Sequence, residues 1–139
     1  MTFVDTSAIY AVLDRKDENH TSAEEQWHAL LDAGSPLLTT NYVVVESCAL
    51  AQSRLGMDAV RTIQDEILPA MELLWIDEEN HRLAMAALLA ARRRKLSLVD
   101  CTSFSVMRQA GIRIAFAYDR HFAEEGFVFP TAPSAPSPR

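Results

Sequence analysis

Short apolar runs alternate along this chain with longer stretches that have a helical pattern. We predict strands at residues 2–4, 37–40, 71–76, 112–118 and 127–129, and helices at about residues 7–13, 22–33, 42–55, 58–68, 78–95, 98–110 and from 120 onward. This alternation is typical of a parallel sheet, because parallel strands are joined by crossover helices. The predicted fold class is therefore α/β, with a central parallel sheet of about five strands.

Length and composition indicate one folded domain. The chain has 139 residues, of which 49% are hydrophobic and 23% charged, as in an ordinary globular protein. We predict a domain over residues 1–129, followed by a disordered tail over residues 130–139, in which proline alternates with small residues. The longest apolar stretch, residues 83–91, is too short to span a membrane, so we expect a cytoplasmic protein with no membrane partner.

The charge excludes one class of nucleic-acid-binding protein. A formal net charge of -6 argues against a domain whose whole surface binds nucleic acid. It does not exclude a nuclease, since a local basic run stands at residues 92–95. That run either attracts phosphate groups or only complements the dipole at the end of its helix. Cys48 and Cys101 lack the spacing of a zinc site.

Four acidic residues stand where predicted strands pass into helices. Asp5 and Asp119 close two strands, Asp100 lies in the first turn of a helix, and Glu46 lies in the second turn of another. In a parallel sheet, ligands bind beyond the carboxyl ends of the strands. Each aspartate also has a simpler explanation as a helix cap, and Asp100 fits a capping box with Ser97. As a set, the four acids nevertheless indicate a shared site.

A cluster of carboxylates needs a cation. Two carboxylates about 4 Å apart repel each other by roughly 4 kcal/mol near a protein surface. Oxygen ligands without nearby cysteine or histidine favour Mg²⁺ or Mn²⁺ over Zn²⁺. Such a pocket serves phosphodiester hydrolysis, because the ion activates water and stabilises the leaving oxygen.

Four segments together resemble one known family. They are the opening Phe3-Val4-Asp5-Thr6-Ser7-Ala8, the helix that carries Glu46, the run from Leu96 to Phe104, and Ala117-Tyr118-Asp119-Arg120-His121-Phe122. This ordered set is similar to the PIN-domain nucleases, and within them to the VapC-type toxins. The resemblance covers residues 2 to about 129. It implies a three-layer α/β/α sandwich and an endoribonuclease that depends on Mg²⁺ or Mn²⁺.

The resemblance also assigns roles to single residues and implies partners. Asp5, Glu46, Asp100 and Asp119 become the catalytic and metal-site residues. Thr6, Ser7 and Arg120 become weaker candidates for substrate binding. An RNA substrate, an antitoxin protein and a homodimer are implied as partners. One position departs from related sequences, because Ala117 stands where a serine or threonine is common two residues before the fourth acid.

Other functions remain to be weighed. A PIN domain could serve in housekeeping RNA processing, or could bind RNA or protein without cutting it. A phospho-acceptor signalling domain would have paired acids after the first strand and a lysine near the end of the fifth, and this chain has neither. A hydrolase built on Asp-x-Asp is disfavoured because Ser7 replaces the second acid.

Three further expectations concern burial. The helix at residues 78–95 is apolar more than halfway round, so we expect it to be covered by the core or by a second subunit. We expect Trp27 and Trp75 in the core. We expect His121 at the surface, without a catalytic role.

Overall fold

A computed structural model describes residues 1–131 and contains a four-stranded parallel sheet. The strands are β1 (Thr2–Val4), β2 (Leu37–Thr40), β3 (Glu72–Leu74) and β4 (Ile114–Phe116), in the order β3-β2-β1-β4. The predicted parallel α/β fold is confirmed. The predicted fifth strand at 127–129 is wrong, since Val128 forms only an isolated parallel bridge with Ile114. Residues 132–139, which make up most of the predicted tail, lie outside the described part of the chain.

The connections between the strands are helical. They are α1 (Thr6–Leu13), α2 (His20–Asp32), α3 (Asn41–Leu55), α4 (Met57–Thr62), the π-helix η1 (Ile63–Ile67), the 3₁₀-helix η2 (Leu68–Ala70), α5 (Glu78–Ala91), α6 (Leu98–Ala110) and α7 (Arg120–Glu124). The α5 helix ends four residues earlier than predicted, because Arg92 has a φ of 53° in the left-handed region. The α2 helix begins at His20, two residues before its predicted start at residue 22.

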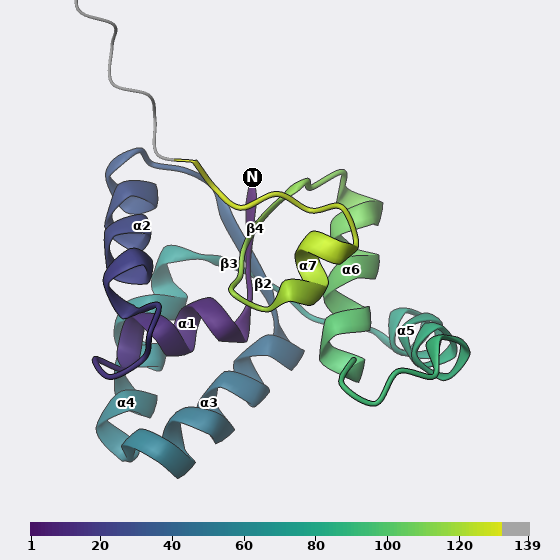
Figure 1. Ribbon diagram of the computed structural model, residues 1–139, viewed down its shortest axis with the longest axis horizontal. Coiled ribbons are helices and arrows are strands. Elements are labelled where there is room, and N and C mark those ends of the chain that lie inside the picture. The colour runs from purple at the N-terminus through teal and green to yellow at the C-terminus, as the bar shows by residue number, and fades with distance from the viewer. Residues whose placement is uncertain (132–139) are drawn as a thin grey trace, which may run out of the picture.

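The helices cover both faces of the sheet. In Figure 1, α1 and α2 lie on one side of the strands and α6 and α7 lie on the other, with α5 packed outside α6. This is the three-layer α/β/α arrangement that the resemblance implies. The side chains of Phe3 on β1 and Phe116 on β4 are fully buried between the layers.

Strand order places one edge of the sheet where a ligand can bind. The chain adds β2 and β3 on one side of β1 and then returns to add β4 on the other side. Because all strands are parallel, their carboxyl ends lie at the same edge, and the order reverses at β1. The α1 and α3 helices begin directly at this edge, immediately after β1 and β2.

Some large apolar side chains remain exposed. Trp27 is buried as predicted, whereas Trp75 is 71% exposed, so its predicted place in the core is wrong. Trp75 follows the edge strand β3, which has no sheet neighbour on its outer side. On α5, Leu83 and Leu89 are 53% and 68% exposed, so this chain alone does not cover the apolar helix. Across residues 1–131, no helix has both the length and the apolar character needed to cross a bilayer.

Candidate metal centre

Asp5 stands at the point where β1 passes into α1. It caps α1, and its Oδ2 atom accepts hydrogen bonds from the backbone N–H of Ser7 at 3.1 Å and from the Ser7 hydroxyl at 2.7 Å. Its other oxygen, Oδ1, is buried without a hydrogen-bond partner among residues 1–131. Burial raises the pKa of Asp5 from 3.8 to about 7, although the Ser7 hydrogen bonds oppose this shift. A buried carboxylate oxygen without a partner is costly unless a cation or a proton compensates it.

Asp100 lies in the first turn of α6 and belongs to the capping box that the sequence predicts. The Ser97 hydroxyl accepts from the Asp100 N–H at 3.0 Å, and the Ser97 N–H donates to Asp100 Oδ2 at 3.2 Å. Burial raises the pKa of the Asp100 carboxyl, and the charges of Asp119 and Glu46 add to this effect. The capping role and an electrostatic role therefore coincide in one residue.

Asp119 is the N-cap of α7 and is half-buried. Its Oδ1 atom accepts a hydrogen bond of 2.9 Å from the backbone N–H of His121. One ligand atom from each of Asp100, Asp119 and His121 lies within 4.8 Å of the others, which is close enough for these residues to surround one ion.

Glu46 approaches the same place from the second turn of α3. It is half-buried and lines a hollow of about 300 Å³ with Tyr42, Val45 and Val99. Its negative charge contributes to the raised pKa of both Asp5 and Asp100. The four predicted acids therefore lie close enough together for their charges to interact.

The three aspartates share one arrangement. Each gives one carboxylate oxygen to a hydrogen bond at the beginning of its helix, and no hydrogen bond within residues 1–131 engages the other oxygen. The cap explanation and the metal explanation are therefore compatible, because they use different oxygens. The positive ends of the α1 and α6 dipoles at this edge also reduce the repulsion among the carboxylates.

This donor set fits a hard divalent cation. It offers carboxylate oxygens only, one of them buried and unpartnered, as Mg²⁺ and Mn²⁺ prefer. His121 does not add a nitrogen ligand, because both of its ring nitrogens are already hydrogen-bonded within the protein. The residues present therefore fit a divalent metal ion bound through oxygen.

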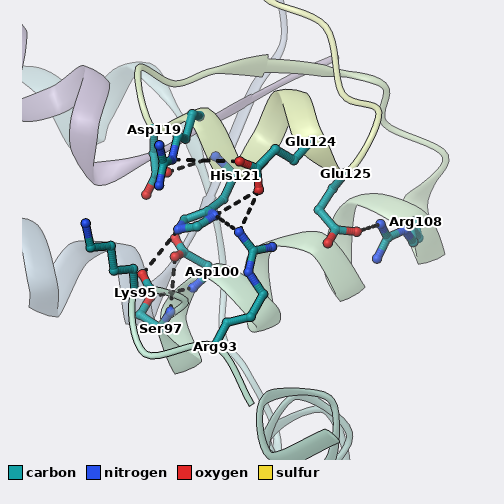
Figure 2. A network of polar contacts seen from close by, with 10 residues as sticks. Arg93, Lys95, Ser97, Asp100, Arg108, Asp119, His121, Glu124 and Glu125 are labelled. Atoms are coloured by element: carbon teal, nitrogen blue, oxygen red, sulfur yellow. Dashed lines mark hydrogen bonds and ion pairs between the residues drawn. The ribbon is translucent and has the colours of Figure 1, made fainter. Parts of the chain in front are cut away.

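His121 belongs to a polar network that sequence reasoning missed. The expectation of a surface position is wrong, since His121 is only 4% exposed. Figure 2 shows its ring between the Lys95 carbonyl on one side and Arg93 with Glu124 on the other. The only sequence signal for this network is that basic residues stand shortly before Asp100 while acidic residues follow Asp119.

The weaker candidates have different surroundings. The Thr6 hydroxyl is buried and donates to the Val43 carbonyl at 3.4 Å. The Ser7 hydroxyl is engaged with Asp5 and with the backbone N–H groups of Tyr118 and Asp119. The Arg120 side chain is 72% exposed beside Glu124. Of these three, Arg120 has the most open position for contact with a substrate.

Known proteins are similar to this chain in sequence over nearly its whole length. The family model described as PIN domain matches residues 2–127. The chain is 33% identical over 131 residues to the 23S rRNA-specific endonuclease VapC20 of Mycobacterium tuberculosis, as found in two strains, CDC 1551 and H37Rv. This alignment covers 92% of the chain and 96% of the relative.

Solved structures give the same result. The crystal structure of Mycobacterium tuberculosis VapC20, described as a Sarcin-Ricin loop cleaving toxin, matches with a TM-score of 0.81 and 30% identity, over 92% of this chain and 97% of the other. FitAcB from Neisseria gonorrhoeae matches with a TM-score of 0.63 over 94% and 97%, and at 15% identity it supports the fold alone. The resemblance inferred from the four sequence segments is confirmed. The chain belongs to the PIN domain family.

Proposed function

We propose that this chain is a Mg²⁺- or Mn²⁺-dependent endoribonuclease that hydrolyses RNA phosphodiester bonds as the toxin of a toxin-antitoxin pair. The observation that carries the proposal is the shared arrangement of Asp5, Asp100 and Asp119. Each has one oxygen fixed by a helix cap and the other free at the same edge of the sheet. The similarity to a toxin endonuclease over nearly the whole chain supports the activity.

The protein's own residues hold and orient the reacting groups. Asp5, Asp100 and Asp119 would bind the cation through the oxygens that the caps leave free, and Glu46 would bind it or hold its water. A bound divalent cation lowers the pKa of water and stabilises negative charge on the leaving oxygen. Because each cap hydrogen bond restricts rotation of its carboxylate, the ligands are oriented before the ion binds.

Basic residues stand in the loop that leads to Asp100. The loop between α5 and α6 carries Arg92, Arg94 and Lys95, all exposed and without an ion pair to another residue in the range 1–131. Arg93 in the same loop is instead paired with Glu124 at 2.8 Å. Phosphate groups of a bound RNA would meet the three unpaired cations and Arg120 next to the acids.

Ribosomal RNA is the first substrate class to test. VapC20 is described as specific for 23S rRNA and as cleaving the Sarcin-Ricin loop. This chain is 33% identical to it over nearly its whole length and has acids at all four predicted positions. We therefore infer that a structured ribosomal RNA hairpin is a better substrate than an unstructured RNA.

Two protein partners follow from the same proposal. We infer an antitoxin that holds the nuclease inactive in the cytoplasm. We also infer a homodimer that covers exposed apolar residues of α5, including Leu83 and Leu89. Burial of such side chains in an interface would contribute roughly 1.5–3 kcal/mol for each fully covered leucine.

The direct experiment measures RNA cleavage by the purified wild type and by Asp100→Asn. We expect Mg²⁺- or Mn²⁺-dependent cleavage of 23S rRNA that EDTA abolishes and that the variant lacks. Equal cleavage by both proteins would contradict the proposal. Mn²⁺ binding without cleavage by the wild type would instead favour a PIN domain that binds RNA without cutting it.

Asp77→Asn is the matched control. Asp77 caps α5 as Asp100 belongs to the cap of α6, and it accepts from the Asn80 N–H at 2.9 Å. The substitution removes one negative charge at a helix cap outside the acidic cluster. Asp77→Asn should therefore cleave RNA at the wild-type rate.

A further inference from the structure

We propose that His121, together with Arg93 and Glu124, is a positioning unit that fixes the distance between Asp100 and Asp119. This inference rests on the proposed function, since it concerns how the candidate metal ligands are held. It assigns no contact with RNA or with the ion to these three residues. They act through the loop between α5 and α6, which they attach to α7.

The unit connects the two acids through a continuous path. Asp119 Oδ1 accepts from the His121 N–H at 2.9 Å, and the His121 ring contacts the Lys95 carbonyl through Nε2 at 3.2 Å. Two residues further along, the Ser97 N–H donates to Asp100 Oδ2 at 3.2 Å. This path joins the start of α7 to the loop that leads into α6. It therefore links two acids that are 19 residues apart in the sequence.

Hydrogen-bond chemistry determines which ring nitrogen carries the proton. A carbonyl oxygen only accepts, so His121 Nε2 carries hydrogen and donates to Lys95. Nδ1 lies 3.2 Å from Arg93 Nη2, which only donates, and 3.3 Å from Glu124 Oε2, which only accepts. In the neutral ring, whose one proton is on Nε2, Nδ1 accepts from Arg93. The ring therefore has no free lone pair for a metal, although it lies within 4.8 Å of ligand atoms of both acids. Its place beside the cluster fits positioning and not coordination.

Arg93 and Glu124 hold the ring from its other side. Arg93 Nη2 donates to Glu124 Oε2 at 2.8 Å and approaches His121 Nδ1 from the same position. The ring is buried, whereas the Arg93 and Glu124 side chains are 44% and 41% exposed. A buried ring with both nitrogens satisfied cannot rotate without losing a hydrogen bond, so the network restrains both segments that it joins.

A second arginine–glutamate pair at the end of α7 provides a matched control for the pair of Arg93 and Glu124. Glu125 follows Glu124 directly and pairs with Arg108 at 2.5 Å, away from the acids (Figure 2). Each pair consists of one arginine and one glutamate at the end of α7, and only the side chains of the pair with Glu124 contact the His121 ring. Glu125→Gln and Arg108→Gln therefore repeat the charge changes of Glu124→Gln and Arg93→Gln without touching the positioning unit.

The experiment measures Mn²⁺ affinity by titration, together with kcat, KM and Tm, in the full chain. His121→Leu preserves volume but removes both ring hydrogen bonds, while His121→Gln can still donate toward Lys95. We expect His121→Leu to weaken Mn²⁺ binding and to lower kcat by about 10- to 100-fold, with KM for RNA nearly unchanged. His121→Gln should recover part of both losses.

Two readouts separate positioning from general stability. In the metal-free wild type, nitrogen NMR of the imidazole should show the Nε2–H tautomer. At equal Tm, Arg93→Gln and Glu124→Gln should weaken Mn²⁺ binding more than Arg108→Gln and Glu125→Gln do. Because Arg93 and Glu124 are partly exposed, their variants keep the test valid if His121→Leu fails to fold. Wild-type Mn²⁺ affinity in the His121 or Arg93 variants, or equal losses in both sets of pairs, would overturn the inference. Absence of Mn²⁺ binding and cleavage in the wild type would instead refute the proposed function itself.

Discussion

The Ser7 hydroxyl donates a hydrogen bond of 2.7 Å to Oδ2 of Asp5. The Ser7 hydroxyl oxygen in turn accepts from the backbone N–H groups of Tyr118 at 2.8 Å and Asp119 at 3.2 Å. Ser7 therefore joins the acid that ends β1 to the backbone of the acid that follows β4. A single hydroxyl fixes two of the candidate metal ligands relative to each other.

Removal of this hydroxyl should affect both stability and metal binding. Ser7→Ala leaves the partly buried N–H groups of Tyr118 and Asp119 without their acceptor, which should lower the free energy of unfolding by about 1–3 kcal/mol. The hydrogen bond from the Ser7 hydroxyl also lowers the pKa of Asp5, so its loss should raise that pKa further and weaken Mn²⁺ binding near pH 7. Urea unfolding and Mn²⁺ titration measure the two effects.

Ser22→Ala provides the control for Ser7→Ala. The Ser22 hydroxyl also contacts this region, at 2.7 Å from the Tyr118 hydroxyl, but its contact is exposed and lies away from the acids. The variant should retain wild-type Mn²⁺ affinity. If both serine variants bind Mn²⁺ as tightly as the wild type, Ser7 has no role in organising the metal ligands.

The buried Asp5 should make stability depend on pH in a specific direction. Its pKa is about 7 in the folded protein against 3.8 for the ordinary carboxyl. Because the pKa of Asp5 is higher in the folded protein than in the unfolded chain, protonation of Asp5 stabilises the folded state. This stabilisation is fully present below the ordinary pKa and is lost as pH rises through about 7. Asp5→Asn should therefore stabilise the metal-free protein at pH 8, by about 1–3 kcal/mol, and much less at pH 5.

Urea unfolding in EDTA at both pH values measures this difference. Asparagine can still accept the Ser7 hydrogen bonds, so the substitution mainly removes the buried charge. A stability difference between Asp5→Asn and the wild type that stays constant from pH 5 to pH 8 would contradict the assigned burial.

Lys95 should contribute to RNA binding and not to the chemical step. Figure 2 shows its ammonium group extending away from the network that holds its carbonyl. Lys95→Gln should raise KM for RNA several-fold, with kcat nearly unchanged. It should also reduce the slope of log affinity against log salt concentration by about 1, the value expected for loss of one phosphate contact. Lys16→Gln, in the loop after α1, is the control and should change neither quantity. An equal effect of both substitutions would indicate that only net charge matters.

The exposed face of α5 should mediate self-association. Leu89, which is 68% exposed, is the most exposed leucine of that helix. In sedimentation experiments, Leu89→Lys should shift a dimer to monomer while the far-UV circular dichroism spectrum stays unchanged. Glu79→Lys, at an exposed position in the first turn of α5, controls for the added positive charge. A wild-type protein that remains monomeric at high concentration would contradict this prediction.

Local sequence signals predict the regular parts of the fold well. The strands β1 and β2 and the helix α6 have the predicted bounds, and the capping box of Ser97 and Asp100 forms as expected. These features depend on residues within one or two turns of each other. The acids were also predictable as a group, because parallel strands bring their carboxyl ends to one edge.

Features that depend on distant contacts could not be predicted in this way. His121 is buried because its ring meets the Lys95 carbonyl 26 residues earlier, and no local pattern encodes that contact. Trp75 is exposed because β3 lies at the edge of the sheet, which only the strand order determines. The early end of α5 depends on Arg92, a residue type that rarely adopts the left-handed conformation found there.

The most direct test of the metal centre is to locate Mn²⁺ by anomalous diffraction in a crystal of the wild-type protein. We predict a peak bounded by Asp5 Oδ1 and by the oxygens of Asp100 and Asp119 that do not accept cap hydrogen bonds. A peak elsewhere on the molecule, or no peak at a saturating Mn²⁺ concentration, would contradict the claim that these three capped aspartates form a metal centre.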